Sequence, residues 1–524
     1  MKMNSNKVVL LKPANNTSFR LIPFGLLTLG SYLDKHGFDV KIFDCSIKAD
    51  YDTILKEIED ALLVGLSVAT FEVPSAYEIT KYIKAHSKTP ILWGGMHPTL
   101  YPEQTISDKN IDYIIVNEGD ETLLELATLL KENKSIENVR GLGFKRDGKV
   151  MINPMRHLLN VEELPNINYD LINFREHIAM SDFPTIVYES SRGCPYLCTF
   201  CWNAVVEGRQ KFRPKSAKKI VDEIEYLMNK YNVPHVSFVD DNFFVYKHRV
   251  QEFCKIVKER NLKFTWFAEC RADYFRDNYI NEEFLDMLWE CGLRYLTIGA
   301  ESGSQRILDE MKKGIQVENV VQCAKILSKY PIQVGYGFII GMPSETKEEL
   351  YQTIAHIKRV RKINRYAGVG AVVLTPYPKS EITSHLVEQG IIKEPKTLEE
   401  WTLEEHQNVH TGRYLDKPWI KHKKLIKGVS YATRVAFDDM SIARFKRVVS
   451  KLQWYYLPDI LFTGIALLRV KTNFYYFLID KWMFDKIVKL RNNTYKKYIF
   501  PLRSKLVSKS SKNKLRVSPL SQNN

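Results

Sequence analysis

The sequence predicts an α/β protein with three parts: an N-terminal doubly wound, Rossmann-like domain, a partial (β/α)6 TIM-like barrel, and a mainly helical C-terminal region. Short apolar strands alternate with amphipathic helical stretches from residue 8 to about residue 130, and this alternation resumes with a longer period from residue 185. The alternation ends near Trp401. A chain of 524 residues with 45% hydrophobic residues can bury the two or three cores that these parts need.

The first domain, residues 1–145, is predicted to be a parallel sheet covered by helices on both faces, because its strands are short and apolar throughout. The expected strands are Val8–Lys12, Val40–Phe43, Val64–Ala69, Ile91–Gly94 and Tyr113–Val116. The expected helices are Phe24–His36, Tyr51–Ala61, Ser75–Ala85 and Glu121–Leu130. Residues 146–183 lose this rhythm and contain Pro154 and Pro165, so we expect an inter-domain linker there.

The barrel is expected over residues 184–400. Its expected strands are Ile186–Glu189, Val236–Asp240, Phe264–Glu269, Tyr295–Gly299, Val334–Ile340 and Ala371–Thr375. Six strands with five intervening helices suit an incomplete barrel better than a closed one of eight units.

Residues 401–504 are predicted to be a basic helical region, and residues 505–524, rich in Ser, Lys and Asn, a disordered tail. The net charge of +15 belongs to this end of the chain, because residues 420–524 hold 23 Lys and Arg against 5 Asp and Glu. A basic, aromatic surface of this kind can contact an anionic membrane, form a solvated helical cap, or bind nucleic acid. We favour peripheral membrane contact, and nucleic acid is the least favoured because no RNA-binding signature is present.

The chain shows no apolar signal segment near Met1, and its eight cysteines are too unevenly placed for a disulfide framework. The apolar run Ile460–Leu468 is about half the length that a bilayer crossing needs. We therefore expect a cytoplasmic protein, with any membrane contact at the surface.

Three cysteines, Cys194, Cys198 and Cys201, lie within eight residues directly after the first barrel strand. Zinc would require a fourth Cys or His at paired spacing, and none follows closely. Three thiolates on a four-iron cluster would leave one iron open for another ligand. The alternatives are a zinc site completed by a distant histidine, or three unrelated buried thiols.

This C-x3-C-x2-C run resembles the cluster loop of the radical S-adenosylmethionine (SAM) superfamily. The resemblance implies a [4Fe–4S] cluster on the three cysteines and SAM bound at the open iron. One electron, from an external flavodoxin- or ferredoxin-type donor, would cleave SAM to a 5′-deoxyadenosyl radical.

Residues at the carboxyl ends of the barrel strands also match this family. By the resemblance, Phe200 packs near the adenine, Asp240 and Asp241 bind the methionine amino group, Glu301 contacts the ribose, and Gly341 and Glu345 belong to the segment that lines the adenine. Each has a structural alternative, such as a helix cap for the aspartates, a solvated loop acid for Glu301 or an ordinary turn for the glycine. Their order along the chain favours the SAM site.

The first domain resembles the cobalamin (B12)-binding module that precedes many radical SAM barrels. The matching loops at the carboxyl edge of its sheet contain Ser67, Gly94, Gly95, Glu118 and Gly119. The D-x-H-x-x-G motif that supplies an axial histidine is absent from Lys12–Ser18, so either cobalamin binds without that histidine or the pocket has lost it. His97 is a further candidate ligand, although a loop histidine satisfied within the protein is the favoured interpretation.

Together these features predict a radical SAM enzyme, cobalamin-dependent, that methylates an unactivated carbon of a small-molecule or lipid-like substrate. The sequence does not identify which protein residue, if any, is catalytic. The alternatives are a radical SAM enzyme that performs cyclisation or oxidation with a cobalamin-free N-terminal domain, and a non-catalytic sensor of redox state or cobalamin.

Overall fold

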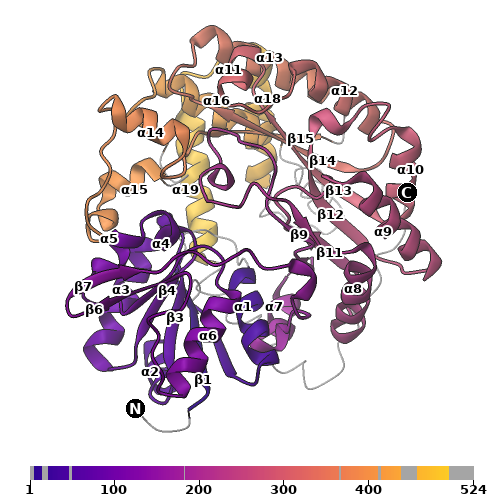
Figure 1. Ribbon diagram of the computed structural model, residues 1–524. Helices are drawn as coiled ribbons and strands as arrows, with labels where there is room; N and C mark the ends of the chain where they lie inside the picture. Colours follow the sequence, from indigo (N-terminus) through magenta and orange to yellow (C-terminus); the bar gives the residue numbers. More distant parts are fainter. Residues whose placement is uncertain are drawn as a thin grey trace. The chain divides into compact units, whose positions relative to one another are not determined.

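The computed structural model describes residues 5–14, 22–45, 50–181, 183–364, 367–410, 415–437 and 457–494 (Figure 1). Its contacts divide the chain into two units. The first unit holds residues 1–174, 200–209 and 375–414, and the second holds residues 175–199, 210–374 and 415–524. The expected disordered tail at 505–524 lies outside the described residues.

The first unit is built on a seven-stranded sheet in the order β2-β1-β3-β4-β5-β6-β7. Its parallel strands are β1 (Lys7–Lys12), β2 (Asp39–Asp44), β3 (Leu63–Ser67), β4 (Ile91–Gly94) and β5 (Tyr113–Ile115). Its helices are α1 (Phe24–Lys35), α2 (Tyr51–Ile58), α3 (Val73–His86), α4 (Met96–Leu100), α5 (Pro102–Ser107) and α6 (Asp120–Lys131). The strands and helices expected from the sequence are confirmed here to within a few residues.

The parallel strands of this sheet send neighbouring residues into two different cores. Val9 and Leu11 belong to one apolar cluster, whereas Val8 and Leu10 belong to the other. Because successive side chains of a strand point to opposite faces, both faces of the sheet are covered. The doubly wound prediction is therefore confirmed.

An antiparallel hairpin that the sequence analysis did not anticipate extends the sheet beyond β5. It consists of β6 (Leu142–Arg146) and β7 (Lys149–Ile152), joined by Asp147 and Gly148 with φ angles of 49° and 74°. Two residues with positive φ are typical of the tight turn that matches the twist of a hairpin. After it, residues up to 181 contain the short helices η2 (Val161–Glu163), η3 (Tyr169–Leu171) and α7 (Phe174–Met180).

The second unit contains six parallel strands in the order β15-β14-β13-β12-β11-β8. They are β8 (Ile186–Tyr188), β11 (His235–Phe238), β12 (Thr265–Arg271), β13 (Leu293–Glu301), β14 (Gln333–Ile340) and β15 (Ala367–Val373). The helices between them are α8 (Ala217–Tyr231), α9 (Lys247–Glu259), α10 (Glu282–Glu290), α11 (Gln305–Glu310), α12 (Val317–Leu327) and α13 (Lys347–Ile363). This open parallel sheet confirms the predicted partial barrel.

The two faces of the barrel sheet differ in composition. On β14, Tyr336 and Phe338 are buried, whereas the alternate positions Gly335 and Gly337 are only partly buried. On β12, Trp266 and Ala268 are buried, whereas Glu269 stays exposed. The face opposite the buried side chains therefore includes small and polar residues such as Gly335, Gly337 and Glu269 beside the larger Phe267 and Ile339, and the carboxyl ends of such strands are where barrels bind ligands.

The segment from α14 (Glu381–Glu388) to α15 (Glu404–His410) packs within the first unit, with the short helix η6 (Glu400–Thr402) between them. Trp401 is completely buried and joins one apolar core of the N-terminal sheet. Its indole Nε1–H donates a hydrogen bond to Gln104 Oε1 at 2.6 Å, and Tyr101 Oη donates to Glu394 Oε1 at 2.7 Å. Residues near position 400 thus complete the core of a domain that begins near position 7.

The C-terminal helices of the second unit are α16 (Lys423–Ala436), α18 (Leu457–Thr472) and α19 (Ile479–Thr494). They confirm the expected helical character over residues 415–437 and 457–494, which contain no strand. Within the parts that the structure describes, no helix has the length and apolar character that a membrane crossing would need.

Candidate functional site

Cys194 and Cys198 lie in the loop after β9 (Ser191–Arg192), which pairs with β10 (Arg213–Pro214). Both are free thiols; Cys198 is buried and Cys194 partly buried. Burial raises the pKa of both thiols, although the positive charge of Lys313 opposes this increase at Cys198. Two thiols are thus held, largely out of water, at the carboxyl edge of the barrel sheet.

Cys201 follows Cys198 by three positions, within a stretch that groups with the first unit. This stretch, residues 200–209, also contains Phe200. It contacts the loop after β5, where Asn117 Nδ2 donates a hydrogen bond to Glu207 O at 3.1 Å. The placement of Phe200 near an adenine stays a prediction.

Tyr196, between the first two cysteines, is fixed by side chains that the sequence analysis did not single out. The Arg271 guanidinium lies 3.6 Å from the centre of the Tyr196 ring. The hydroxyls of Tyr196 and Tyr274 are 3.1 Å apart, and Asn242 Nδ2 donates to the Tyr274 hydroxyl at 3.0 Å. A planar guanidinium on an aromatic face is a favourable contact, so the end of β12 braces the cysteine loop.

The loop is held a second time at Thr199. Its backbone N–H donates to Met311 O at 3.0 Å, and its hydroxyl donates to Glu310 O at 3.2 Å. The cysteine loop is therefore attached both to the end of β12 and to the carboxyl end of α11.

Glu301, at the end of β13, forms a buried ion pair with Lys313 at 2.6 Å. Glu301 has a φ of 57°, which is uncommon for a residue with a side chain, and the strand register shifts at this point. Burial disfavours the charged form of Lys313, but Glu301 and Cys198 outweigh it and the pKa of Lys313 is raised. A Cβ at Gly299 would lie 2.4 Å from Glu301 Oε1, so glycine there makes room for the pair.

Asp240 and Asp241, predicted together, have different surroundings. Asp240 is buried, and its carboxylate accepts hydrogen bonds from Ser190 N–H at 2.7 Å and from Ser191 Oγ at 2.7 Å. Arg249 lies 3.9 Å away and is buried as well. The Asp240 carboxylate is thus engaged in ordering the strand that leads into the cysteine loop.

Asp241 is partly exposed and lies on the side of the cysteines, since its charge contributes to raising the pKa of Cys194. Its charge also acts on Glu269 on β12, which the sequence analysis did not single out. Although Glu269 is exposed on the face of the sheet, desolvation by the protein around it raises its pKa, and Asp241 and Glu301 raise this pKa further, whereas Lys313 lowers it. The carboxylates of Asp241, Glu269 and Glu301 and the ammonium group of Lys313 therefore act on one another beside the thiols.

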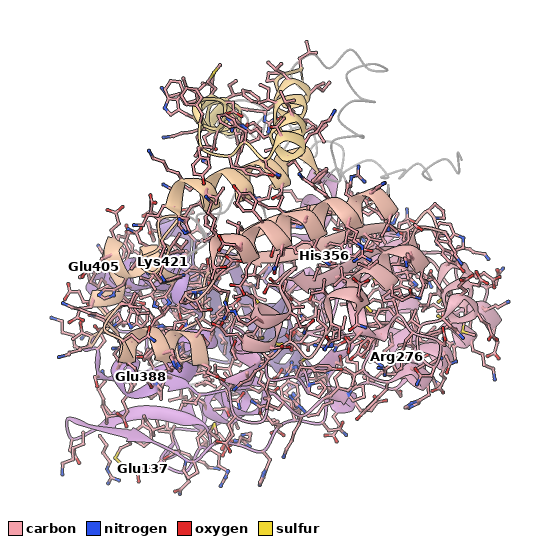
Figure 2. All side chains as sticks on the ribbon, turned by 90° about the horizontal axis from the view of Figure 1, so that it is seen from above. Glu137, Arg276, His356, Glu388, Glu405 and Lys421 are labelled. Carbon is pink, nitrogen blue, oxygen red and sulfur yellow. The ribbon has the colours of Figure 1, made fainter. Side chains whose placement is uncertain are left out.

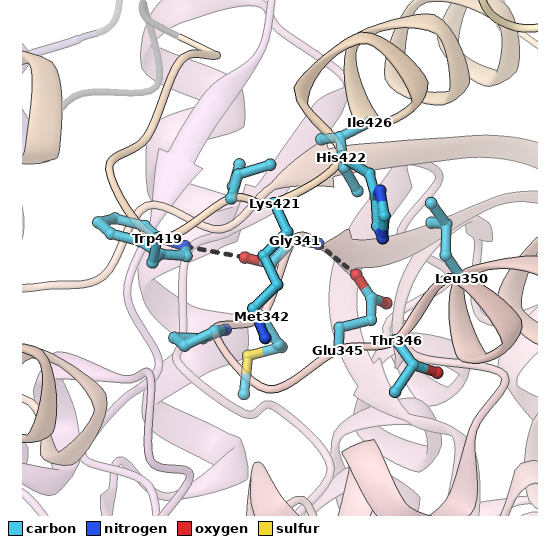
Figure 3. A pocket seen from close by; sticks show the side chains of 11 residues that line it. Gly341, Met342, Glu345, Thr346, Leu350, Trp419, Lys421, His422 and Ile426 are labelled. Atoms are coloured by element: carbon cyan, nitrogen blue, oxygen red, sulfur yellow. Dashed lines mark hydrogen bonds between the residues drawn. The ribbon is translucent and has the colours of Figure 1, made fainter. Parts of the chain in front are cut away.

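Gly341 and Glu345 meet in the turn after β14 (Figure 3). The Gly341 N–H donates to Glu345 Oε2 at 2.6 Å, and Trp419 Nε1–H donates to Gly341 O at 2.9 Å. Burial raises the pKa of Glu345 to about 7, and its buried Oε1 has no hydrogen-bond partner among the residues that the structure describes. Gly341 has a φ of 80°, which suits glycine. The structure brings both predicted residues together, beside a small pocket whose other wall includes Trp419 and His422.

Ser67, Gly94 and Gly95 come together at the carboxyl edge of the first unit's sheet. Ser67 pairs in register with Gly94, and a Cβ on Gly95 would lie 3.2 Å from Ser67 Oγ. Among the described residues, a Cβ on Gly94 would meet only Ile115, at 4.0 Å. The edge at Gly94 is therefore a cradle that a side chain would fill, and it fits the close approach of a broad, flat ligand.

Glu118 and Gly119 lie in the next loop, at the start of α6. This loop is tied to the previous one through Thr99, whose hydroxyl donates to Gly95 O at 2.7 Å and accepts from Asn117 N–H at 2.9 Å. All five residues predicted for this edge thus lie at or just beyond the carboxyl ends of three neighbouring strands.

His97 is completely buried among aromatic rings rather than placed at the open edge. Its ring packs edge-on against Trp401 at 5.2 Å, and its Nδ1 lies 3.4 Å from Thr70 Oγ1. Burial and then the nearby His410 lower the pKa of His97 to about 3. These contacts favour an uncharged structural histidine over a cobalt ligand.

Acid is expected to destabilise the protein through His97. The unfolded state takes up a proton near pH 6.5 and the folded state only near pH 3, so stability falls as the pH drops below 6.5, by about 1.4 kcal/mol per pH unit for this group. Replacing His97 with Phe should remove this component from urea-unfolding midpoints measured between pH 7 and pH 5. The exposed His86, replaced in the same way, serves as the control, and an unchanged pH slope in the His97→Phe protein would contradict the assignment.

The second unit contains thiols, the type of ligand that iron–sulfur clusters use. In the described part of the chain, no group of three or more His, Cys, Asp or Glu is arranged around one metal position. Each cysteine ligand of an iron–sulfur cluster binds its own iron atom, and thiolates are the ligands that such clusters use. Cys194 and Cys198, free and partly desolvated, fit that requirement.

Comparison with known proteins identifies two families along the chain. A family model described as the radical SAM superfamily matches residues 188–357, and one described as the B12 binding domain matches residues 13–127. The first range contains the cysteine loop and strands β11 to β14. The second contains strands β2 to β5.

Individual proteins with similar sequences or structures carry names that fit these two families. The uncharacterized methyltransferase PH0819 of Pyrococcus horikoshii is 30% identical over 403 residues, which are 74% of this chain and 85% of that protein. An anaerobic magnesium-protoporphyrin IX monomethyl ester cyclase of Synechocystis is 25% identical over 320 residues, 60% of this chain and 63% of that enzyme. The solved structure of the cobalamin-dependent SAM radical enzyme OxsB, with aqua-cobalamin and SAM bound, matches 98% of this chain and 82% of its own, with a TM-score of 0.67 and 19% identity. At that identity the likeness concerns the fold.

Proposed function

This chain belongs to the family of radical SAM enzymes that carry a B12-binding domain, and on that premise we propose that it methylates an unactivated carbon of a small-molecule or lipid-like substrate. When bound, a [4Fe–4S] cluster supplies the electron that cleaves SAM to a 5′-deoxyadenosyl radical, and cobalamin supplies the methyl group. The chain's own residues bind and orient these groups and exclude water from them. Cys194, Cys198 and Cys201 would hold the cluster.

The observation that carries the proposal is the mixture of charges around the braced cysteine loop. The methionine end of SAM has an ammonium and a carboxylate. Asp241 and Glu269 offer acceptors to the ammonium, while Arg271 and Lys313 provide positive charge close by. Arg271 also holds the loop itself, so this residue links the position of the thiols to that of the charged groups.

The first unit supports cobalamin binding through its open edge. Gly94 leaves space over the end of β4, and the loop from Asn117 to Gly119 borders it. Ser67 and Glu118 add polar groups at the same edge. The loop expected to lack the axial histidine falls largely in residues 15–21, outside the described residues.

Methyl transfer is favoured because the relative with the greater coverage is named a methyltransferase. The relative named a cyclase supports ring formation as a second candidate on the same cofactors. The substrate, the flavodoxin- or ferredoxin-type electron donor and the cytoplasmic setting remain predictions from the sequence.

Anaerobic reconstitution with iron, sulfide and cobalamin tests the proposal. We expect a corrin spectrum at about one cobalamin per chain and 5′-deoxyadenosine when SAM and a reductant are added. In cells fed methionine labelled in its methyl group, a metabolite or lipid carrying that label should disappear when the gene is deleted. If the protein forms 5′-deoxyadenosine but the deletion strain loses no labelled product, cyclisation or oxidation is favoured. If the reconstituted protein binds no corrin, cobalamin has no role. If the reconstituted protein never cleaves SAM, the proposed enzymatic function is wrong and the non-catalytic sensor is the hypothesis that remains.

A further inference from the structure

The hairpin of α18 and α19 displays large apolar side chains that no other described part of the chain covers. Seven of them, exposed by 53% to 69%, are Leu461, Leu468, Phe474, Phe477, Ile479, Trp482 and Leu490. Figure 2 shows these two yellow helices at the outer end of the second unit, with side chains drawn as sticks. Soluble surfaces rarely gather so many apolar side chains, and such a patch marks an interaction site.

The tip of the hairpin is rigidly built rather than loosely packed. The buried Arg469 pairs with the buried Asp480, and its guanidinium donates to the backbone carbonyls of Phe474, at 3.0 Å, and Phe477. Between those residues Tyr475 is completely buried. Its backbone packs tightly on α16, because a Cβ added to Gly428 of that helix would lie 2.0 Å from the Tyr475 carbonyl oxygen. The backbone of the turn is therefore fixed while its flanking aromatic side chains point outward.

Positive charge surrounds these side chains. Lys471, Lys486 and Lys489 are exposed, and Lys486 Nζ lies 3.9 Å from the centre of the Trp482 ring. Residues 420–524 hold 23 Lys and Arg against 5 Asp and Glu, so a second copy of the chain would bring like charges together. Aromatic side chains at the acyl boundary, with lysines among anionic headgroups, are typical of helices that lie on a membrane.

From these contacts we propose that the α18–α19 hairpin docks this protein onto the surface of an anionic lipid membrane. Phe474, Phe477 and Trp482 enter the interface, and the three lysines meet the headgroups. Docking does not depend on the chemistry of the barrel, so it can be tested independently of the proposed methyl transfer.

Flotation of the full-length protein with lipid vesicles tests this surface. We expect binding to vesicles of phosphatidylcholine mixed with phosphatidylglycerol, and weaker binding to phosphatidylcholine alone. Replacing Phe474 and Phe477 together with serine should lower partitioning about tenfold, because two large apolar side chains are lost from the interface. Replacing Lys471, Lys486 and Lys489 with glutamate should remove the preference for anionic vesicles.

The matched control replaces Tyr226 of α8 and Met287 of α10, which are exposed apolar residues outside the hairpin, with serine; its binding should equal that of the parent protein. Trp482 gives a second measurement, a blue shift of fluorescence on vesicle binding that the Trp482→Phe protein lacks. Equal partitioning of the parent and the Phe474→Ser/Phe477→Ser protein would overturn the proposal. A second outcome would also overturn it: the parent protein fails to bind vesicles and forms a dimer by light scattering, and the Phe474→Ser/Phe477→Ser protein is a monomer.

Discussion

Loss of the iron–sulfur cluster is the expected result of replacing Cys198 with alanine. The variant should contain far less than one cluster per chain, and its rate of 5′-deoxyadenosine formation should fall more than about a hundredfold, since losing a residue that merely supports a metal ligand already costs 10- to 100-fold. Iron and sulfide analysis, the visible absorption spectrum and SAM cleavage under anaerobic conditions measure these effects.

Cys254 provides the control for this experiment. It is also a buried free cysteine, but it lies on α9, away from the cysteine loop. The Cys254→Ala protein should keep its iron, its sulfide and its SAM cleavage. If the Cys198→Ala protein kept them too, the assignment of the loop as the cluster site would be wrong.

The adjacent aspartates at the end of β11 should respond to substitution in opposite ways. Replacing Asp240 with asparagine should lower the free energy of unfolding by about 3 kcal/mol, because Arg249 would remain buried without its counter-charge and Ser190 and Ser191 would lose their carboxylate acceptor. Replacing Asp241 with asparagine should change stability by less than about 1 kcal/mol, because Asp241 is partly exposed.

SAM binding separates the two roles. The dissociation constant for SAM should rise about tenfold in the Asp241→Asn protein, which loses one charged acceptor for an ammonium group. Urea unfolding and equilibrium binding of SAM to the reconstituted proteins measure the two effects. A stable Asp240→Asn protein that fails to bind SAM, beside an Asp241→Asn protein that binds normally, would reverse the assignment.

The strands of both units were predictable because buried parallel strands are continuously apolar or alternate strictly. Val8–Lys12 and Val334–Ile340 show the two patterns, and the structure has strands at Lys7–Lys12 and Gln333–Ile340. The hairpin at Asp147-Gly148 also had a local signal, since an Asp-Gly pair between alternating residues is typical of a two-residue turn. The loss of apolar rhythm after residue 146 concealed it.

The contacts that organise the site had no such signal. Arg271 and Tyr196 are 75 positions apart in the sequence, and each has an ordinary place in it, one at the end of a strand and one in a loop. The pair of Glu301 and Lys313 requires an unusual φ at Glu301, which depends on the register of β13 against β14. Propensity and spacing describe neighbours along the chain, whereas these contacts arise only when the strands are assembled.

The segment of residues 375–414 has a consequence for dividing this protein into modules. Leu398 and Trp401 fill one apolar face of the N-terminal sheet, so a fragment that stops at residue 145 would expose that face to water and tend to aggregate. A chimera that exchanges this domain between relatives would need to carry both stretches of the gene, because their side chains interlock in a single core.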